Sequence, residues 1–471
     1  MREGPIRKTH FVGIGGTGMC GLAEILLSLG YEVSGSDLAT GTDATERLAR
    51  LGAQIATGHA AENARGKDLL VVSSAVGEEN PEVREARRLG LPVLKRGEML
   101  AELMRLKYGV AIAGAHGKTT TTSLIGHVLS SAGLDPTVIV GGRLRSVGSH
   151  ARLGAGDVLV AEADESDGSF LKLLPTVAVV TNIDREHLDH YRDLDAIRDA
   201  FLRFIQGVPF YGVAVLCGDD PHLRALLPGV NKPVLTYGMG ADCRVQARDV
   251  CPGADGSRFA VRADERELGE FLVPLPGGHN VLNALAGIAV ARFLGVPADA
   301  IRRGLASFEG VGRRFERRGE AGGVVHIDDY GHHPTEIAAV LRTAREVFGS
   351  RRLVVLFQPH RYSRTAALRQ EFGGAFRDAD EVVVTEIYAA GEAPIPGVSG
   401  ETLCDAIAAA GTLVRYVPAE TEAIACVAER LHPEDVLLTL GAGSVWKWGD
   451  AVMELRRSGS APLRVARAGG P

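Results

Sequence analysis

A Gly-rich turn between a predicted strand and a predicted helix carries residues that suit phosphate chemistry. The apolar run 110–113 predicts a buried strand, and residues 123–129 predict a helix. Glycines in such a turn let backbone N–H groups close on phosphate oxygens, and the helix N-terminus adds a favourable dipole. We expect Lys118 to reach the β- and γ-phosphates of a nucleoside triphosphate, and the Thr119 hydroxyl to bind Mg²⁺. The turn consists of Gly114, Ala115, His116, Gly117, Lys118, Thr119 and Thr120.

This turn departs from the usual phosphate-loop signature, which has an additional glycine at the position of Ile112. The pattern present is the shorter Gly-x-x-Gly-Lys-Thr, and an ordinary Gly turn between strand and helix is the alternative. Four successive threonines, at 119–122, argue against that alternative. β-Branched residues start helices poorly unless their hydroxyl groups are used.

Two further predicted strands, 157–161 and 177–183, lead into acidic residues and histidine. The carboxyl ends of parallel strands meet at one edge of a sheet, which is also where a phosphate loop opens. Glu162, one residue past its predicted strand, is placed to hold Mg²⁺. His187 is a candidate for a second metal ion or for the γ-phosphate.

A second Gly-rich turn, Gly-x-Gly-x-x-Gly at 13–18, follows a predicted strand near the N-terminus. Asp37 lies about 20 residues after it, which is the spacing of a dinucleotide-binding fingerprint. The pattern requires only a diphosphate at a helix N-terminus, so a nicotinamide cofactor is one reading among others. Ser73 and Ser74 open a loop after another predicted strand of the same segment.

Two asparagines, Asn280 and Asn283, follow His279 at the start of a later predicted helix. They are three residues apart and therefore share a helix face. Asn280 is either a plain helix N-cap or a reader of a nucleotide base, and the sequence leaves both open.

The last third of the chain places cations after two predicted strands. His332 and His333 follow strand 324–327, and His360, Arg361 and Arg364 follow strand 353–357. Arginine forks suit the carboxylate of an amino acid. No Ser-His-Asp or Cys-His grouping is evident. If ATP phosphorylates a carboxylate, the acyl phosphate needs mainly positioning and charge neutralisation for an amine to attack it.

The length and composition of the chain exclude several classes of protein. A chain of 471 residues predicts two to four domains. The net charge of −6 provides no basic field, so nucleic acid is not expected as the main partner. Six scattered cysteines without a Cys-x-x-Cys pattern indicate free thiols, and no stretch predicts a signal peptide or a membrane span. We therefore expect a cytoplasmic α/β protein.

Five motifs together resemble the Mur ligase family, and the resemblance extends to about residue 452. They are 114–120, 162–167, 279–283, 329–334 and 358–365. The resemblance implies three domains: a Rossmann-like domain for UDP-N-acetylmuramate at 1–107, a central P-loop ATPase domain at 108–312, and a Rossmann-like amino-acid-binding domain at 313–471. It implies ATP and Mg²⁺ as cofactors and a monomer or homodimer as the assembly.

The resemblance also implies roles for individual residues. Lys118, Glu162 and His187 would be catalytic, with Thr119 and Glu162 on one Mg²⁺ and His187 on a second. The ATP site would be formed by the 114–120 turn, with His279, Asn280 and Asn283 near the adenine. The UDP-sugar would face Gly15, Gly16, Thr17, Gly18, Asp37, Ser73 and Ser74. L-Alanine would lie near Tyr330, His332, Arg361 and Arg364.

Within the family, the motifs are most similar to the branch that adds L-alanine to UDP-N-acetylmuramate. Several other branches use a carbamylated lysine, but no lysine occurs between Lys172 and Lys232. Glu186, Leu188 and His150 depart from the usual family pattern. The alternatives are the branch that recycles a tripeptide, a folylpolyglutamate-synthetase-like ligase, a nicotinamide dehydrogenase and a non-catalytic UDP-sugar sensor.

Overall fold

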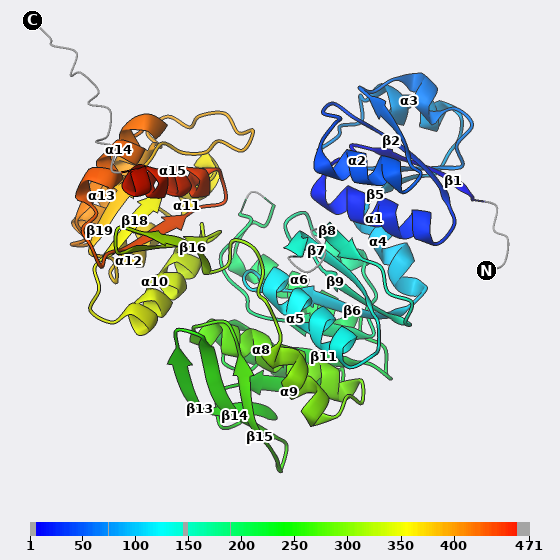
Figure 1. The fold of residues 1–471 in the computed structure, drawn as a ribbon. Helices are drawn as coiled ribbons and strands as arrows, with labels where there is room; N and C mark the ends of the chain where they lie inside the picture. The colour runs from blue at the N-terminus through cyan, green and yellow to red at the C-terminus, as the bar shows by residue number, and fades with distance from the viewer. Residues whose placement is uncertain (1–5, 74, 145–148, 189, 459–471) are drawn as a thin grey trace, which may run out of the picture. The chain divides into compact units, whose positions relative to one another are not determined.

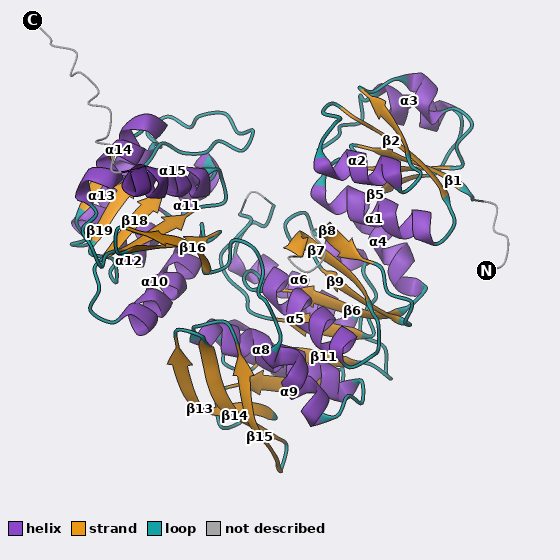
Figure 2. Ribbon diagram, viewed as in Figure 1, coloured by secondary structure: helices purple, strands orange, loops and turns teal. Residues whose placement is uncertain are grey.

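The computed structural model describes residues 6–73, 75–144, 149–188 and 190–458, which form three β-sheets flanked by helices (Figure 1). Strands and helices alternate along most of the chain (Figure 2). The chain divides into two compact units, one built mainly from residues before Gly312 and the other mainly from Gly312 onward. The predicted α/β fold is confirmed, while the exact domain boundaries stay a prediction.

The first sheet has five parallel strands in the order β3-β2-β1-β4-β5. The strand order reverses between β1 and β4, and ligands of open α/β sheets bind at such a point, outside the carboxyl ends of the strands. The strands are β1 (Lys8–Val12), β2 (Glu32–Asp37), β3 (Gln54–Thr57), β4 (Leu69–Val72) and β5 (Val93–Lys95). The helices are α1 (Thr17–Ser28), α2 (Asp43–Arg50), η1 (Ala61–Ala64), α3 (Pro81–Arg88) and α4 (Arg96–Arg105).

The second sheet has ten strands in the order β15-β14-β13-β12-β11-β10-β6-β9-β7-β8. Strand β6 lies between β9 and β10 and is parallel to both, so the loops that follow these three strands open at the same edge. The strands are β6 (Tyr108–Ala113), β7 (Thr137–Leu144), β8 (Ser149–Arg152), β9 (Val158–Glu162), β10 (Val177–Val180), β11 (Val213–Cys217), β12 (Val234–Gly238), β13 (Val245–Gly253), β14 (Gly256–Ala263) and β15 (Arg266–Val273). The helices are α5 (Lys118–Ser131), η2 (Ser169–Lys172), α6 (Leu194–Gln206), α7 (Pro221–Leu226), η3 (Leu227–Gly229), α8 (Gly278–Phe293) and α9 (Ala298–Ala306).

The third sheet has six strands in the order β16-β17-β21-β18-β19-β20, and β16 is its antiparallel edge. The loops after β17 and β18 therefore flank the end of β21. The strands are β16 (Glu316–Ala321), β17 (Val324–Asp329), β18 (Leu353–Phe357), β19 (Glu381–Val384), β20 (Val414–Tyr416) and β21 (Val436–Leu440). The helices are α10 (Pro334–Phe348), α11 (Tyr362–Ala367), α12 (Arg369–Ala375), α13 (Gly400–Ala409), α14 (Glu420–Arg430) and α15 (Val445–Ser458).

Strand β18 shows why these strands are continuously apolar. Val355 and Phe357 belong to the core on one face of the third sheet, and Val354 and Leu356 belong to the core on the other face. Successive side chains of a strand point to opposite faces, so a parallel strand covered by helices on both sides needs apolar residues at every position. Within the described residues, no helix combines the length and the apolar character that crossing a bilayer requires.

Candidate active site

The Gly114–Thr120 turn leaves β6 and enters α5, as predicted, and both of its glycines are required by geometry. Gly114 has a φ of 132°, and a Cβ atom there would lie 2.1 Å from Thr181 Oγ1. Gly117 has a φ of 81°, and its Cβ would lie 2.7 Å from Asn283 Oδ1. Both φ values belong to the region that L-residues avoid. Helix α5 begins at Lys118, so the threonine run lies in its first turns.

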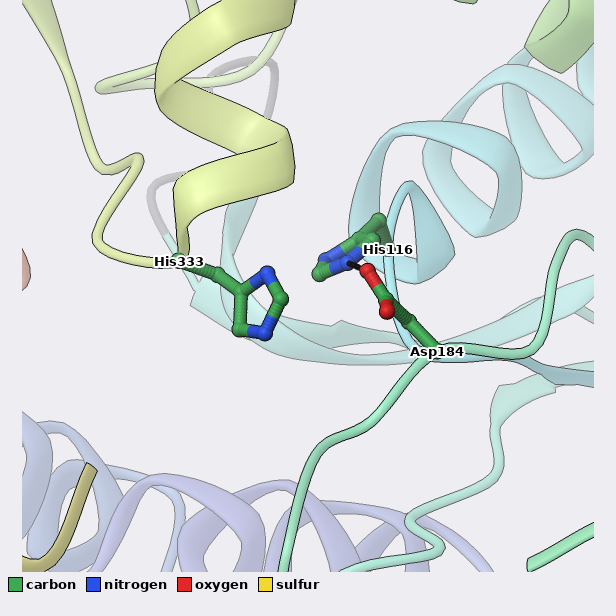
Figure 3. A group of neighbouring side chains, drawn as sticks. All are labelled: His116, Asp184 and His333. Carbon is green, nitrogen blue, oxygen red and sulfur yellow. Dashed lines mark hydrogen bonds and ion pairs between the residues drawn. The ribbon is translucent and has the colours of Figure 1, made fainter. Parts of the chain in front are cut away.

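The turn is anchored by residues that follow the neighbouring strand β10. The backbone N–H of His116 donates to Asn182 Oδ1 (2.8 Å), and the Thr181 hydroxyl donates to the His116 carbonyl (2.6 Å). The His116 Nε2 atom lies 2.9 Å from Asp184 Oδ2 (Figure 3). These contacts hold the loop in its folded shape and explain how the sequence after β10 positions it.

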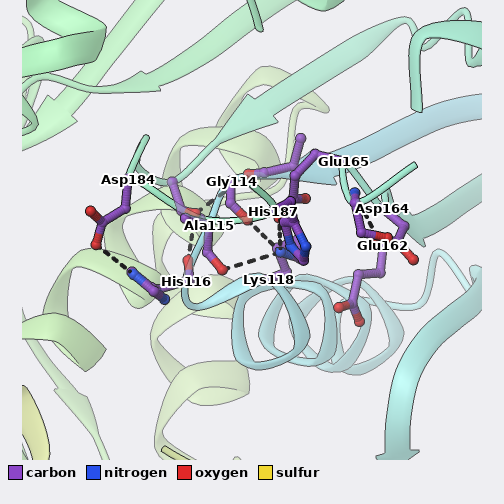
Figure 4. A network of polar contacts seen from close by, with 12 residues as sticks. Gly114, Ala115, His116, Lys118, Glu162, Asp164, Glu165, Asp184 and His187 are labelled. Carbon is purple, nitrogen blue, oxygen red and sulfur yellow. Dashed lines mark hydrogen bonds and ion pairs between the residues drawn. The ribbon is translucent and has the colours of Figure 1, made fainter. Parts of the chain in front are cut away.

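Lys118 folds back over its own loop. Its ammonium group donates to the carbonyls of Gly114 (2.6 Å) and Ala115 (3.2 Å) and forms an ion pair with Glu165 Oε1 at 2.6 Å (Figure 4). Desolvation opposes the charged form, but the nearby carboxylates of Glu165 and Glu186 raise the pKa of Lys118 above its ordinary value. The Lys118 side chain is therefore protonated at neutral pH, and its positive charge lies beside the backbone of the Gly114–Thr120 turn.

Thr119 and Glu162 meet as predicted. The Thr119 hydroxyl lies 3.1 and 3.2 Å from the two carboxylate oxygens of Glu162. Glu162 is the last residue of β9, whereas the sequence predicted that it lies one residue past the strand. The hydroxyl and carboxylate oxygens are hard ligands of the kind that Mg²⁺ prefers. Thr120 is buried within α5.

His187 lies in a cluster with two acids. Its Nε2 atom is 3.5 Å from Glu165 Oε1, and single ligand atoms of Glu165, Glu186 and His187 all lie within 4.8 Å of one another. Desolvation opposes protonation, but the two carboxylates raise the pKa of His187. Glu165 is 3% exposed, and its Oε2 atom has no hydrogen-bond partner among the described residues. An orphaned buried carboxylate oxygen in such a cluster fits a divalent cation.

Asn280 is not the N-cap of its helix. It is the third residue of α8, and its amide donates to the Pro276 carbonyl at 2.8 Å. Asn283 accepts a hydrogen bond from the Thr121 hydroxyl (3.0 Å) and so joins α8 to α5. Desolvation and the positive charge of Arg314 lower the pKa of His279 to about 4. The predicted roles of these three residues near an adenine stay predictions.

In the first sheet, the 13–18 turn closes on the end of β2. The Gly13 and Ile14 N–H groups donate to the Ser36 carbonyl (2.8 and 3.0 Å), and the Gly15 N–H donates to Asp37 Oδ2 (2.8 Å). Gly16 is the N-cap of α1, and the Ser73 N–H donates to the Val12 carbonyl. The predicted residues Gly15, Gly16, Gly18, Asp37 and Ser73 thus share this edge of the sheet. Ser74 and the Thr17 side chain lie outside the described part of the structure.

Arg96 was not predicted from the sequence, but it belongs to this region. A Cβ atom at Gly18 would lie 2.8 Å from its Cδ, so its side chain lies directly beside the start of α1. It also pairs with Asp164 at 3.1 Å. A cation beside a helix N-terminus favours an anionic ligand there.

The third sheet brings together three of the predicted amino-acid-binding residues, Tyr330, His332 and Arg364, around His360, while the Arg361 side chain pairs with Glu392. The Tyr330 and His332 rings lie edge to face at 5.4 Å, and the His332 and His360 rings are 5.6 Å apart. Arg364 reaches His360 through its Nη1 atom at 3.3 Å. His333 caps α10 and accepts from the Thr335 N–H. Loops that follow β17 and β18 therefore build one cluster of aromatic and cationic groups.

Two further site residues, besides Arg96, had no role predicted from the sequence. Glu165 contacts both Lys118 and His187, and its signal was its place in the acidic run that follows β9. Tyr388 stacks on His360 with ring centroids 5.5 Å apart and planes at 11°. It comes from the loop after β19, and nothing in the spacing of the sequence marks that contact.

These three regions match three family models in order along the chain. Residues 8–108 match the Mur ligase family catalytic domain, residues 112–291 the Mur ligase middle domain, and residues 313–443 the Mur ligase glutamate ligase domain. The chain belongs to the Mur ligase family.

Curated relatives extend the match over almost the whole chain. The UDP-N-acetylmuramate–L-alanine ligase of Desulfatibacillum aliphaticivorans is 54% identical over 448 residues, which is 95% of this chain and 98% of that protein. The ligase of the same name from Acidithiobacillus ferrooxidans is 56% identical over 445 residues, covering 93% and 96%.

Solved structures agree in fold. A UDP-N-acetylmuramate-alanine ligase from Thermotoga maritima superposes with a TM-score of 0.78 at 31% identity, covering 96% of this chain and all of that one. A murein peptide ligase from Psychrobacter arcticus gives a TM-score of 0.69 at 26% identity, covering 95% and 98%. The three-domain Mur ligase architecture predicted from the motifs is confirmed.

Proposed function

We propose that this chain joins L-alanine to UDP-N-acetylmuramate in an ATP-dependent reaction that forms an amide bond. The observation that carries the proposal is the identity of 54–56% over at least 93% of the chain with ligases of that name. The strand-end clusters of the three sheets supply matching chemistry. They hold a helix N-terminus beside Arg96, a phosphate loop with Lys118, and a cluster in which the Arg364 guanidinium group contacts His360.

The reaction proceeds in two steps in this proposal. A carboxylate oxygen of UDP-N-acetylmuramate attacks the γ-phosphorus of ATP, and the bond from that phosphorus to the bridging oxygen breaks, so ADP leaves and an acyl phosphate forms. The alanine nitrogen then attacks the acyl carbon, the carbon–oxygen bond to phosphate breaks, and the nitrogen loses its proton to solvent. The products are ADP, phosphate and the amide.

The protein's contribution is positioning and charge. Lys118 supplies a fixed positive charge for the transferred phosphoryl group, and the first N–H groups of α5, from Lys118 to Thr120, hold its oxygens. Arg361 and Arg364 suit the carboxylate of the amino acid, because guanidinium groups bind carboxylates through two parallel hydrogen bonds. These roles, like those predicted for Gly15 to Gly18, Asp37 and Ser73, are part of the proposal.

Mg²⁺ fits the residues present. Thr119 and Glu162 would hold one ion, and His187 with Glu165 and Glu186 would hold a second. When bound, a divalent cation neutralises charge on phosphate oxygens. The cytoplasmic location and the monomer or homodimer assembly expected from the sequence stay predictions.

Phosphate release from ATP and Mg²⁺ tests the proposal. Release should require UDP-N-acetylmuramate and L-alanine together. No release with L-alanine, but release with the tripeptide L-Ala-γ-D-Glu-diaminopimelate, would assign the chain to the recycling branch and contradict the proposal. Oxidation or reduction of a nicotinamide cofactor without phosphate release would contradict the proposed ligase activity.

A further inference from the structure

The loop after β19 runs beside the loop that carries the predicted amino-acid-binding arginines. The Tyr388 N–H donates to the Pro359 carbonyl (2.8 Å), and the Arg361 N–H donates to the Tyr388 carbonyl (2.9 Å). These two bonds continue the parallel pairing of β18 and β19 beyond the ends of both strands. The two loops are therefore held in register up to Arg361.

The β19 loop then reverses in a tight turn. The Glu392 N–H donates to the Ala389 carbonyl at 3.0 Å, and the two central residues, Ala390 and Gly391, have φ values of 50° and 86°. Positive φ at both central positions is the signature of a type I′ turn. Alanine adopts this conformation at an energetic cost, and such strain concentrates at functional sites.

The turn directs the Glu392 carboxylate back at the other loop. Its Oε1 atom lies 2.7 Å from Arg361 Nε and accepts from the Ser363 hydroxyl at 2.6 Å, and its Oε2 atom accepts from the Ser363 N–H at 3.0 Å. Desolvation opposes ionisation, but the Ser363 hydrogen bonds and the Arg361 charge lower the pKa of Glu392. Glu392 is an ionised acceptor with three donors.

Arg361 is restrained in backbone and side chain alike. Its φ of 71° is unusual for a residue with a side chain, and it stands at the N-cap of α11. The Glu392 carboxylate fixes the Nε edge of its guanidinium group. A guanidinium group is planar, so one charge-assisted bond at Nε sets the plane in which its other donors lie.

We propose that Glu392 is a positioning residue for Arg361 and sets the orientation in which this guanidinium group binds the carboxylate of the incoming amino acid. The inference rests on the proposed function of the third domain. An arginine already held in its binding geometry loses less side-chain freedom when the amino acid binds, so affinity for the amino acid depends on Glu392.

Glu386 provides a matched control on the same loop. Its Oε1 atom accepts from the N–H groups of Ile387 and Gly400, and its Oε2 atom bonds the Tyr416 hydroxyl. It organises the base of the loop, and none of these partners is Arg361. Glu386→Gln therefore reports on general disturbance of the loop.

The test is steady-state phosphate release by the full-length enzyme, with each of the three substrates varied in turn. We expect Glu392→Ala to raise the KM for L-alanine at least about tenfold. The KM values for ATP and UDP-N-acetylmuramate should stay within about twofold, because neither ligand needs Arg361. Glu392→Gln keeps an acceptor oxygen and should show a smaller rise, and Glu386→Gln should leave the KM for L-alanine unchanged.

An unchanged KM for L-alanine in both Glu392 variants would overturn the inference. So would an equal rise of all three KM values, or an equal effect of Glu386→Gln, because these results mean loop damage. Absence of alanine-dependent release in the wild-type enzyme would instead overturn the proposed function, and this inference with it.

Discussion

The ammonium group of Lys118 lies 2.6 Å from Glu165 Oε1, and the two residues follow neighbouring strands, β6 and β9, of the second sheet. Glu165 is buried, so removing its partner would leave an uncompensated carboxylate, which is costly. A phosphate group is negatively charged, as Glu165 is, and would compete with it for the same cation. The Lys118 ammonium group therefore has two uses: it pairs with Glu165 in this structure, and it is available to a phosphate group when a nucleotide binds.

Lys118→Ala should abolish phosphate release, because it removes the ammonium group that is proposed to neutralise the transferred phosphoryl group. Binding of UDP-N-acetylmuramate, measured by calorimetry, should change less than about threefold, since the site proposed for it lies at the first sheet and Lys118 follows a strand of the second. Lys172→Ala is the control, because Lys172 forms only a partly exposed pair with Glu98 at 2.6 Å. Turnover of Lys118→Ala at the wild-type rate would contradict the phosphate-loop assignment.

Glu165→Gln should lower kcat by roughly 10²-fold and raise the Mg²⁺ concentration for half-maximal activity. The amide removes the charge that holds Lys118 and the orphaned carboxylate oxygen that fits a cation. Asp167→Asn is the matched control, because Asp167 belongs to the same acidic run but is exposed and accepts only from the Ser169 N–H in the described contacts. Equal effects of both changes would mean that the acidic run acts only through its total charge.

Thr119→Val should also shift the Mg²⁺ dependence of activity, because it removes the hydroxyl that lies 3.1 Å from Glu162. Thr122→Val tests whether any hydroxyl of the helix start matters, since Thr122 donates only to the Lys118 carbonyl in the described contacts, at 2.8 Å. We expect a rise of about tenfold in the Mg²⁺ requirement for Thr119→Val and little change for Thr122→Val. The same shift in both variants would place the cation elsewhere.

Comparing Gly117→Ala with Gly133→Ala separates two reasons for a glycine: a positive φ value, and the lack of room for a Cβ atom. Gly117 and Gly133 have nearly equal φ values of 81° and 84°, but only Gly117 has an atom within reach of an added Cβ, Asn283 Oδ1 at 2.7 Å. Both alanine variants should lose about 1 kcal/mol of unfolding free energy. Only Gly117→Ala should lose ATP-dependent turnover. Loss of turnover in Gly133→Ala as well would make backbone strain alone the cause.

The loops at strand ends were predictable because their signal is local. Gly114, Gly117 and Lys118 are close in sequence, and the acids that meet them follow short apolar runs rich in valine, which are typical of buried parallel strands. Strand β16 was not predicted. Its residues Glu316–Ala321 are mostly polar, because it is the antiparallel edge of its sheet and needs no continuous apolar run. Arg317 and Arg318 belong to this strand.

The positioning contacts were not predictable from spacing. Glu392 and Arg361 are brought together by a parallel pairing that continues past two strand ends and by a turn with Ala390 at a positive φ. Neither the pairing nor the φ value has a sequence signature at that position. The same holds for Arg96, which reaches Gly18 only because α4 and α1 pack together.

Acid should destabilise the fold through buried histidines, of which His326 is the clearest. It is 1% exposed on β17, with Nε2 3.1 Å from Thr439 Oγ1 and Nδ1 3.7 Å from Asp450. Burial lowers its pKa to about 4, although Asp450 and Glu316 act to raise it and Arg318 lowers it further. The unfolded chain takes up this proton below about pH 6.5, whereas the folded chain does not until about pH 4.

The free energy of unfolding should therefore fall as the pH decreases from about 6.5 towards about 4, by up to roughly 3 kcal/mol from His326 alone. Urea unfolding at several pH values measures the slope. His326→Gln should flatten it, whatever its effect on stability at neutral pH, while replacement of the exposed His432 should not. An unchanged slope in His326→Gln would mean that the acid sensitivity arises from other groups, such as His360, whose pKa is also lowered to about 4 by burial.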